Sequence, residues 1–407
     1  MERSCGDVVK EGAGAADRDA SGGVWDVVVV GGGPAGASAA HAAASTGRRV
    51  LLLEKAELPR YKTCGGGIIG PSLDAMPSGF RVPVRDRVHA VTFCLNGRLI
   101  RTRRSRRMLF ALVDRPAFDA ALVEAAREAG AVVRTGVTLS RIDQDGPETA
   151  AVVLCDGQTL SARAVVGADG SAGRTGVHVG VTLAQVDFGM EAEIPVPPAV
   201  AESWARRVLI DWGPVPGSYG WVFPKGHTLS VGVIAARGSG AATRRYMQEF
   251  IARLGLAGFE PDVISGHLTR CRSADSPLSR GRVVVCGDAA GLLEPWTREG
   301  ISFALRSGRL AGEWAVRIAD ARDADVARQR GFDYALAIEA GLGEEMRVGH
   351  RLRTLCERHP GLVHATLAGF RPAWHSFAQF TRGTVTLTQI VGRSALARFL
   401  LFAMGRS

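Results

Sequence analysis

Long apolar runs and paired cysteines are both missing from this chain of 407 residues. No stretch of about eighteen consecutive apolar residues occurs, so we expect no membrane-spanning helix. The seven cysteines are odd in number and none stands in a CxxC pair, which argues against a structural zinc site and a disulfide scaffold. We therefore predict free thiols, no bound metal and a cytoplasmic location, with contact at a membrane surface left open.

Lysine is also scarce: four of the 50 basic residues are lysines, so the net charge of +10 comes almost entirely from arginine. Together with the abundance of Ala, Gly and Val, this is the bias of GC-rich coding DNA. No nucleic-acid recognition motif accompanies the charge, and we predict no nucleic-acid binding. We expect the net positive charge to attract an anionic substrate or a membrane surface instead.

Apolar residues make up 46% of the chain and charged residues 22%, which is typical of a globular protein with a large core. The length allows two domains. Residues 1–24 are polar, rich in Gly and Ala, and lack the apolar centre of a signal peptide. We expect a disordered tail there.

The most specific pattern predicts a dinucleotide-binding βαβ unit. The apolar run Val27–Val30 is typical of a strand buried on both faces of a parallel sheet. Gly31, Gly33 and Gly36 follow with GxGxxG spacing. The first glycine makes a tight turn, the second lets the backbone approach a pyrophosphate, and the third allows close packing of the following helix.

The second strand of this unit ends in a carboxylate. Val50 to Leu53 are apolar and precede Glu54, which is placed to accept the ribose hydroxyls of an adenosine and to disfavour a 2′-phosphate. Ala35 inside the glycine motif and Lys55 beside Glu54 are further candidate cofactor contacts.

Two later segments favour FAD over NAD. One apolar strand ends at Asp169 and Gly170, and another ends at Gly287 and Asp288, ahead of a long amphipathic helix. Such an aspartate can bind a ribityl hydroxyl while the helix N-terminus faces a phosphate or a flavin carbonyl. The order of these motifs, with Gly300-Ile301 downstream, resembles the FAD-dependent oxidoreductases of the aromatic-hydroxylase type. The resemblance implies bound FAD and a discontinuous FAD domain.

A loop after the second strand narrows the family. Pro59 begins a Pro-Arg-x-Lys-x-Cys-Gly-Gly-Gly run, which resembles the geranylgeranyl reductase family of flavoproteins. Gly65 and Gly66 require a loop that permits close backbone approach. The resemblance implies that this loop lies beside the flavin, where Cys64 is a candidate catalytic thiol. The alternative for Cys64 is a small buried apolar side chain.

The resemblance also implies two contacts near the nucleotide half of FAD. Asp114 or the residue before it opens a predicted helix whose apolar face repeats through Phe118, Leu122 and Ala126. The family places the arginine at the position of Arg115 near the cofactor phosphates. A surface arginine at a helix start is the alternative. Val137, after the next strand, is implied to give backbone contacts to adenine.

An aromatic stripe points to the substrate side. Tyr219, Trp221 and Phe223 alternate in Tyr-x-Trp-x-Phe-Pro, which predicts one face of a strand followed by a return strand in HTLSVGV. In geranylgeranyl reductases this motif faces the cavity over the flavin, so Tyr219 and Trp221 are candidate catalytic residues. The chain lacks the Trp-x-Trp-x-Ile-Pro pattern of flavin-dependent halogenases. Plain core packing is the alternative.

One position departs from the family. The flavin loop usually reads Pro-x-x-Gly-Glu-Gly-Ile, whereas Arg298 replaces the first of these glycines here. Its side chain is expected either to narrow the space beside the flavin or to reach an anionic substrate or electron donor. The resemblance covers roughly residues 25–313.

The remaining segments are predicted to complete the substrate side. Asn96-Gly97 between two strand-like runs indicates a hairpin, and the arginines at 101–107 form either a solvated strand end or a diphosphate site. The C-terminal ALARFLLFAMGRS is expected to pack as a helix on the substrate domain, with interfacial attachment as the alternative.

The predicted fold is α/β, with a discontinuous Rossmann-like FAD-binding domain, an antiparallel substrate-domain sheet and C-terminal helices. We assign the FAD-binding domain to 25–80, 108–180 and 270–320, the substrate domain to 81–107 and 181–269, and the helical region to 321–407.

The predicted activity is an FAD-dependent reduction of carbon–carbon double bonds in a prenyl-type or other hydrophobic substrate, such as a prenyl diphosphate or prenyl lipid. No second GxGxxG occurs, so NAD(P)H or a small electron-transfer protein is expected to visit transiently as reductant. The alternatives are a flavin monooxygenase or halogenase-like enzyme and a non-catalytic flavin carrier. A monomer and a homodimer both stay open.

Overall fold

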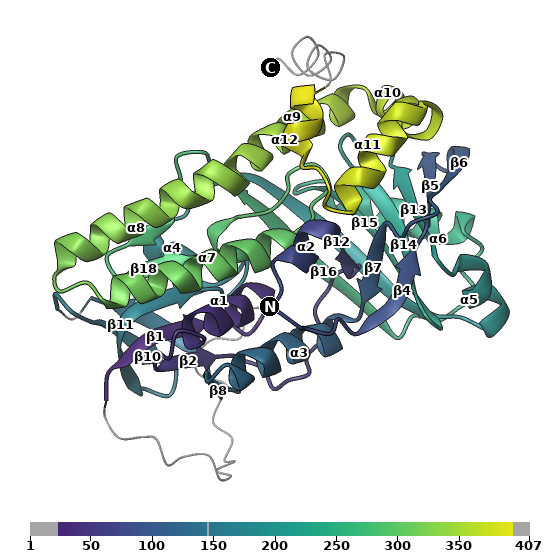
Figure 1. Ribbon diagram of the computed structural model, residues 1–407. Helices are drawn as coiled ribbons and strands as arrows, with labels where there is room; N and C mark the ends of the chain where they lie inside the picture. Colours follow the sequence, from purple (N-terminus) through teal and green to yellow (C-terminus); the bar gives the residue numbers. More distant parts are fainter. Residues whose placement is uncertain (1–22, 145, 394–407) are drawn as a thin grey trace.

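A computed structural model describes residues 23–144 and 146–393 of the chain (Figure 1). The expected N-terminal tail, except its last two residues, and the C-terminal ALARFLLFAMGRS segment lie outside this described part. The described residues form two large sheets, a small three-stranded sheet and a set of helices toward the C-terminus.

An eight-stranded sheet carries the nucleotide motifs. Its longest path has the order β17-β18-β11-β1-β2-β8, and the pairs from β18 to β8 are parallel. Strands β10 and β9 continue from β11 as an antiparallel extension. The strands are β1 (Trp25–Val30), β2 (Val50–Leu53), β8 (Val132–Arg134), β9 (Leu139–Asp143), β10 (Ala150–Leu154), β11 (Thr159–Gly167), β17 (Ser279–Arg280) and β18 (Val283–Val285).

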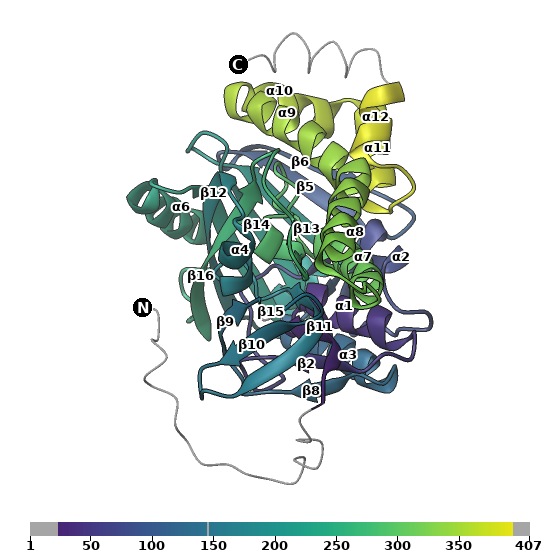
Figure 2. The ribbon, with the colours of Figure 1, turned by 90° about the vertical axis from the view of Figure 1, so that its left-hand side faces the viewer.

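Helices cover one face of this sheet, as Figure 2 shows. They are α1 (Pro34–Ala44), α3 (Arg115–Glu128) and α7 (Ile301–Ala319), with α8 (Ala324–Ile338) packed against α7. Both α1 and α7 pack on strand β1, and Val27, Val28 and Val29 are fully buried. Complete burial explains why this strand is continuously apolar instead of alternating.

Glycines bring α1 and α7 into very close contact. A Cβ built on Gly308 would lie 2.1 Å from the Ala35 carbonyl oxygen, and one built on Gly312 would lie 2.3 Å from the Ala39 carbonyl oxygen. Backbone atoms cannot move away as a flexible side chain can, so these two positions of α7 accept no side chain without a shift of one helix. The motif helix α1 is thereby fixed in place.

A seven-stranded sheet forms the second layer. Its order is β16-β12-β15-β14-β13-β5-β6, and all neighbours are antiparallel except β13 and β5, which are parallel. The strands are β5 (Ala90–Leu95), β6 (Arg98–Arg104), β12 (Leu183–Pro195), β13 (Arg207–Trp212), β14 (Tyr219–Lys225), β15 (Thr228–Ala236) and β16 (Val263–Arg272).

The two predicted hairpins of this sheet are confirmed. Strands β5 and β6 meet at Asn96 and Gly97, whose φ angles of 50° and 70° are the left-handed values that a tight hairpin turn requires. Strands β14 and β15 pair across Gly226, as the aromatic stripe and its return strand predicted.

Each face of the seven-stranded sheet has its own helical cover. Helices α5 (Pro198–Trp204) and α6 (Gly240–Arg253) pack on one face. The other face is covered by C-terminal helices. These helices are α9 (Glu344–Arg358), α10 (Pro360–His364), α11 (Arg371–Thr381) and α12 (Leu387–Arg393), with π-helical turns η2 (Glu339–Gly343) and η3 (Ala365–Gly369).

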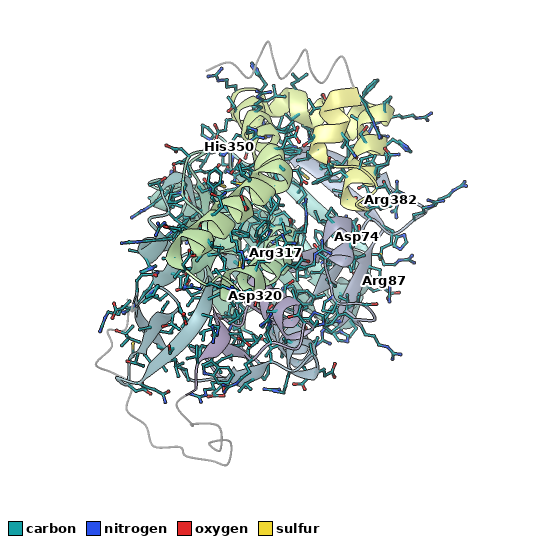
Figure 3. The ribbon with its side chains drawn as sticks, turned by 60° about the vertical axis from the view of Figure 1, so that its left-hand side comes forward. Asp74, Arg87, Arg317, Asp320, His350 and Arg382 are labelled. Carbon is teal, nitrogen blue, oxygen red and sulfur yellow. The ribbon has the colours of Figure 1, made fainter. Side chains whose placement is uncertain are left out.

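Short elements join the two layers. The small sheet has the order β3-β7-β4, from β3 (Gly67–Ile68), β7 (Phe110–Val113) and β4 (Val84–Val88). Helix α2 (Gly70–Asp74) lies against the end of α11, where a Cβ on Gly70 would lie 2.0 Å from the Arg382 backbone. Figure 3 shows Arg382 and Asp74 at this junction. The remaining elements are α4 (Arg174–Val179) and the 3-10 helix η1 (Gly287–Ala290).

The predicted fold class is confirmed, since nucleotide motifs from separate stretches of the chain meet in one mostly parallel sheet beside a second, mostly antiparallel sheet. The exact domain boundaries stay a prediction. None of the helices in the described ranges has the length and apolar content needed to span a bilayer. Cys155 is disulfide-bonded, so the expectation of free thiols was wrong there. The free cysteines are Cys64, Cys94, Cys271, Cys286 and Cys356.

Candidate active site

The three nucleotide motifs converge at one edge of the eight-stranded sheet. A Cβ on Gly31 would lie 2.3 Å from the Ala168 carbonyl oxygen, and one on Gly287 would lie 2.8 Å from the Ala35 Cβ. The turn after β1 therefore touches both the turn after β11 and the turn after β18. This is the edge where α/β sheets bind their ligands.

The glycine turn has the space that a cofactor phosphate needs. A Cβ on Gly36 would lie 1.7 Å from the Gly31 carbonyl oxygen, so the turn and the helix touch directly. A Cβ on Gly33, in contrast, meets only Arg60 Nη2, at 3.5 Å, among the described residues. The backbone is thus closed on the protein side and open at Gly33, which fits the predicted approach of a pyrophosphate.

Glu54 is held beside this turn. Its carboxylate accepts the Gly32 N–H at 2.7 Å and the Ala56 N–H at 3.1 Å, and Arg60 lies 3.5 Å away. Val137 donates its N–H to the Glu54 carbonyl at 3.0 Å, and its backbone contact with adenine stays a prediction. Lys55, the residue after Glu54, is exposed to solvent.

Arg115 is buried, so the alternative of a surface arginine was wrong. It forms a two-bond ion pair with Asp119, at 2.8 and 2.9 Å, and Arg60 reaches the same carboxylate at 3.2 Å. Burial alone would lower the pKa of Arg115, but the Asp119 carboxylate, together with the Cys64 sulfur, raises it overall. Arg60 also lies 3.5 Å from Glu54, so two guanidinium groups and two carboxylates form one charge network next to the glycine turn.

The two motif aspartates have different surroundings. Asp169 accepts the Arg174 and Thr175 N–H groups at 2.6 and 3.1 Å, so it serves the first turn of α4. Gly170 follows with φ of 81°, a left-handed value. As cofactor contacts both residues stay predictions.

Asp288 lies in a cluster built from three separate segments. His267 Nε2 on β16 is 3.7 Å from the Asp288 carboxylate and 2.8 Å from Lys62 Nζ. Burial lowers the pKa of Lys62 to about 8, although Asp288 opposes this shift. Burial would raise the pKa of Asp288, but the neighbouring His267 and the Lys62 charge lower it overall. The sequence singled out Asp288 but neither of its partners.

The Cys64 loop is closed on both sides. A Cβ on Gly66, whose φ is 76°, would lie 2.1 Å from the Val113 carbonyl oxygen. A Cβ on Gly65 would lie 2.6 Å from the Phe223 ring and 3.2 Å from the Trp221 Nε1. The predicted aromatic stripe therefore faces the Cys64 loop directly.

The indole of Trp221 lies flat over its cross-strand neighbour. A Cβ on Gly232 would lie 2.1 Å from the Trp221 ring, so a glycine is needed beneath it. The indole N–H is buried and has no hydrogen-bond partner among the described residues. Tyr219 is 6.0 Å from Trp221 between ring centroids and donates its hydroxyl to the Thr297 carbonyl.

Buried ionised groups on the seven-stranded sheet hold the Cys64 backbone. Lys225 Nζ donates to the Glu193 carboxylate at 2.8 Å and to the Cys64 carbonyl at 3.3 Å. Glu191 accepts the Cys64 N–H at 3.0 Å and the Tyr61 hydroxyl at 3.2 Å. Burial would lower the pKa of Lys225, but the two glutamates raise it overall.

Sequence reasoning missed these carboxylates. Glu191 is fully buried, and its second oxygen has no hydrogen-bond partner in the described part of the chain. The sequence signal was ambiguous, because Gln185, Asp187, Glu191 and Glu193 alternate along β12 and such a pattern is also typical of a strand face exposed to solvent.

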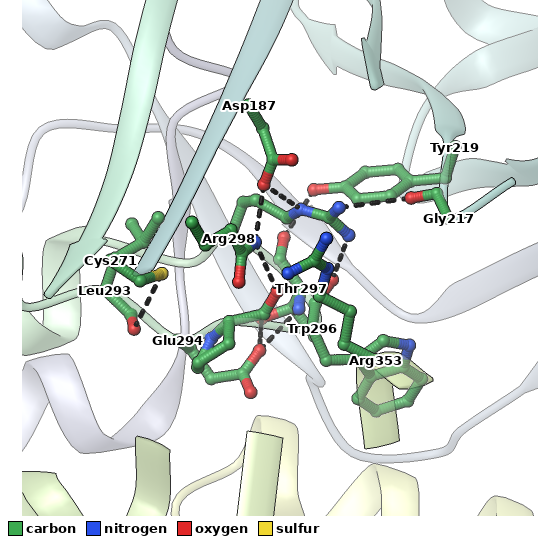
Figure 4. Close-up of polar contacts among 12 residues, drawn as sticks. Asp187, Gly217, Tyr219, Cys271, Leu293, Glu294, Trp296, Thr297, Arg298 and Arg353 are labelled. Atoms are coloured by element: carbon green, nitrogen blue, oxygen red, sulfur yellow. Dashed lines mark hydrogen bonds and ion pairs between the residues drawn. The ribbon is translucent and has the colours of Figure 1, made fainter. Parts of the chain in front are cut away.

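Arg298, within the predicted flavin loop, points its side chain into the core (Figure 4). Its guanidinium donates to Asp187 at 3.0 Å, to the Trp296 carbonyl at 2.7 Å and to the Gly217 carbonyl at 3.1 Å. The Arg298 side chain is 4% exposed. The alternative in which it reaches an anionic substrate or donor was therefore wrong.

These residues fit a flavin dinucleotide. The open backbone at Gly33 and the carboxylate of Glu54 suit its nucleotide half, and Gly300 and Ile301 begin the 19-residue helix α7 next to η1. The positive end of α7 suits the electron-rich edge of a flavin. The Trp221 indole N–H, which has no hydrogen-bond partner in the described part of the chain, lies against Gly65 of the Cys64 loop.

Comparison with known proteins identifies the family. The family described as FAD binding domain matches residues 24–310. A digeranylgeranylglycerophospholipid reductase of Methanoculleus marisnigri is 32% identical over 74% of this chain and 78% of its own. A geranylgeranyl diphosphate reductase of Rhodobacter capsulatus is 31% identical over 72% of this chain and 75% of its own. A menaquinone reductase of Mycolicibacterium smegmatis is 31% identical over 71% and 75%.

Solved structures agree in fold. A geranylgeranyl bacteriochlorophyll reductase-like protein of Thermoplasma acidophilum superposes with a TM-score of 0.70 at 21% identity, covering 93% of this chain and 96% of that one. A flavin-dependent brominase superposes almost equally well, with a TM-score of 0.69 at 15% identity over 93% and 98%. The fold alone does not separate these chemistries. The sequence relatives do, and the chain belongs to the geranylgeranyl reductase family of FAD-dependent oxidoreductases.

Proposed function

We propose that this enzyme saturates carbon–carbon double bonds of a prenyl-type hydrophobic substrate, with FAD as the resident cofactor. The observation that carries the proposal is the direct contact between the Cys64 loop and the aromatic stripe of β14. This places the family's cysteine segment against an apolar surface suited to an alkene chain. The printed activities of the relatives support the substrate class.

Bound FAD, once reduced, supplies two electrons as a hydride to one alkene carbon. The Gly33 turn, Glu54, Arg115 and the Asp288 cluster would hold the cofactor. Trp221 and Phe223 would cover the reacting bond and exclude water from it.

A proton must reach the second alkene carbon. We assign its delivery to Cys64, and the assignment is supported by a thiol held in position: the sulfur accepts the Gly66 N–H at 3.4 Å and the Cys64 backbone bonds to Glu191 and Lys225. Glu191 accepts both the Tyr61 hydroxyl and the Cys64 backbone N–H, so it fixes the position of the loop that carries the thiol. The reductant, NAD(P)H or an electron-transfer protein, would bind transiently from solution.

Anaerobic reoxidation tests the proposal. The purified flavoprotein is reduced without oxygen and mixed with geranylgeranyl diphosphate or geranylgeraniol while flavin absorbance is followed. We expect reoxidation by a prenyl compound and a product with fewer double bonds by mass spectrometry. Reoxidation by oxygen alone, through a flavin hydroperoxide absorbance, would instead establish the monooxygenase alternative.

A further inference from the structure

Strand β6 forms one outer edge of the seven-stranded sheet and is exposed along nearly its whole length. Free backbone groups at such an edge invite pairing with another strand, and charged side chains are one means of preventing it. Edge protection accounts for the arginines of β6 but not for Leu99 and Ile100. These two large apolar side chains are 67% and 68% exposed.

A β-bulge presents these two side chains. The register between β5 and β6 shifts there, so that Leu99 and Ile100 together lie opposite the single residue Cys94. Leu99 has φ of 49°, a left-handed value that favours glycine and is unusual for a bulky side chain. Bulges re-aim side chains, and a strained backbone position is retained where it serves a purpose. A leucine at a position suited to glycine therefore points to a role for the exposed side chain itself.

C-terminal elements extend this edge into a broader surface. Helix α10 packs on β5 and the turn η3 packs on β6, at the upper right of the molecule in Figure 1. Leu362 on α10 and Phe370, the residue before α11, are 37% and 50% exposed. Arg104 of β6 and Arg371 of α11 line one open groove. We call β6 together with Leu362, Phe370 and Arg371 the β6–α11 surface.

The charge around this surface has one sign. Residues 96–113 contain six arginines and no acidic residue, and residues 358–393 contain four arginines, three histidines and no acidic residue. These ten arginines match the net charge of +10, so the rest of the chain holds equal numbers of basic and acidic residues. Among the described residues, no ion pair includes Arg98, Arg101 or Arg104, although many exposed arginines elsewhere are paired. The surface therefore carries positive charge that its own side chains do not neutralise.

Positive charge and apolar side chains together indicate the kind of partner. A second copy of this chain would bring the same arginines face to face, which like-charge repulsion disfavours. The phosphates of a nucleic acid would neutralise the arginines but would leave Leu99 and Ile100 in water. A bilayer with anionic lipids satisfies both, since its negative surface attracts arginines and its acyl chains accept apolar side chains.

We propose that the β6–α11 surface docks the protein on the face of an anionic lipid bilayer. Leu99 and Ile100 enter the boundary of the acyl chains, and the arginines lie at the level of the lipid headgroups. The β6 backbone stays among the headgroups, because free N–H and C=O groups find no partners in the hydrocarbon region. Trp374, which lines the groove together with Arg371, is a side chain suited to the same level. The inference goes beyond the proposed function, because it concerns where the protein binds and not the reaction that it performs.

Sedimentation of the full-length, FAD-loaded protein with lipid vesicles tests the docking surface. Vesicles of phosphatidylcholine alone are compared with vesicles of phosphatidylcholine and phosphatidylglycerol in equal amounts. We expect at least about tenfold tighter binding to the mixed vesicles, and loss of most of this difference at high salt, because salt screens surface charges. Equal binding to both kinds of vesicle, or binding to neither, would overturn the inference.

Removal of the exposed apolar side chains tests their insertion. The variant with Leu99→Ser and Ile100→Ser should bind the mixed vesicles at least about tenfold more weakly than wild type. The matched control is Phe332→Ser with Leu336→Ser on α8, where the side chains are 56% and 52% exposed in the other layer of the molecule. The control should bind like wild type. Equal losses in the two variants would show that exposed apolar area in general, and not this surface, decides the binding.

Removal of charge tests the contact with the headgroups. Arg101→Gln with Arg104→Gln should weaken binding by at least about tenfold and lower its salt dependence. Arg244→Gln with Arg245→Gln is the charge-matched control, since both arginines are exposed on α6, which covers the other face of the sheet. Wild-type binding by the Arg101 and Arg104 variant would place the contact elsewhere. Binding of soluble polyglutamate that depends on these two arginines, without binding of vesicles, would replace the bilayer by an acidic protein partner.

The outcome is separable from that of the proposed function. Detergent-dispersed geranylgeraniol should reoxidise the reduced flavin equally well in wild type and in the variant with Leu99→Ser and Ile100→Ser. If no prenyl compound reoxidises the flavin but vesicle binding depends on these two residues, the reductase proposal fails and the docking surface stands. If reoxidation occurs but neither kind of vesicle is bound, the docking surface fails and the reductase proposal stands.

Discussion

At the residue scale, Arg298 shows how a departure from a family pattern is accommodated. The position has φ of 56°, a left-handed value that favours the glycine usual in the family. Arginine is retained because its guanidinium pairs with Asp187, which is fully buried. The pKa of Arg298 is raised overall, since the Asp187 carboxylate outweighs the effect of burial.

We predict that Arg298→Gly destabilises the protein despite restoring the usual residue. Relief of backbone strain contributes about 1 kcal/mol, whereas leaving a buried carboxylate unpaired costs about 3–5 kcal/mol. The expected net loss is about 2–4 kcal/mol in the free energy of unfolding, measured by urea denaturation.

The control is the double variant Arg298→Gly with Asp187→Asn. It removes the unpaired buried charge of Asp187, so the free energy of unfolding should be at least about 1 kcal/mol higher than in the single variant. A single variant as stable as wild type would show that the ion pair does not stabilise this loop.

Cys64 is the residue on which the proton step depends. We predict that Cys64→Ala lowers the rate of alkene reduction by at least about 100-fold, because alanine cannot donate a proton. FAD content should stay at the wild-type level, since the Cys64 contacts to Glu191 and Lys225 use its backbone. Stopped-flow reoxidation and flavin absorbance measure the two quantities. Unchanged turnover with FAD still bound would dismiss the catalytic role.

Residue-level patterns identified motif positions but not their long-range partners. Lys225 follows the aromatic stripe directly in the sequence, yet its contact with the Cys64 carbonyl joins residues 161 positions apart. Lys62 and His267 are separated by 205 positions. No periodicity or spacing encodes such pairs, because they depend on how the two sheets are placed against each other.

At the element scale, the contact between α1 and α7 depends on the glycines of α7. We predict that Gly312→Ala destabilises the protein by about 1–3 kcal/mol, because its Cβ would lie 2.3 Å from a backbone oxygen of α1. Thermal unfolding monitored by circular dichroism measures the change. Gly341→Ala is the matched control, since a Cβ there meets nothing within 4 Å. Equal effects of the two substitutions would mean that helix propensity, not the close approach, decides the outcome.

Elements encoded by local chemistry were predicted well. The first strand, glycine turn and helix follow from a short apolar run and GxGxxG, and the β5–β6 hairpin follows from Asn96-Gly97. The parallel pairing of β13 with β5 was not predictable in this way, since it joins Arg207–Trp212 to Ala90–Leu95 across more than a hundred residues. The expected all-antiparallel substrate sheet was wrong at that one pair.

At the scale of the whole molecule, the segment from Tyr61 to Gly66 connects the two sheets. Tyr61 and Cys64 bond to Glu191 on β12, and Lys62 contacts His267 on β16. On its other side Lys62 is electrostatically coupled to Asp288, which follows the nucleotide-binding strand β18. If Asp288 contacts FAD as predicted, cofactor binding is coupled to the seven-stranded sheet through the partly buried Lys62.

This coupling predicts that FAD affinity falls as pH rises through about 8. Burial lowers the pKa of Lys62 from 10.5 to about 8, so the free protein loses this charge above that pH. Anionic FAD favours the charged lysine and raises its pKa, so binding above pH 8 requires proton uptake. The association constant should decrease by up to about tenfold per pH unit between 8 and 9.5, measured by flavin fluorescence titration.

Two substitutions assign the effect to Lys62. Lys62→Arg keeps the positive charge at every pH, so the affinity measured at pH 7 should persist to pH 9.5. Lys62→Met removes the charge at every pH, so its affinity should be low throughout and equally flat. A slope that survives in both variants would place the titrating group elsewhere, because neither side chain ionises in this range. A wild type without a slope would show that FAD binding does not depend on the charge that joins the two sheets.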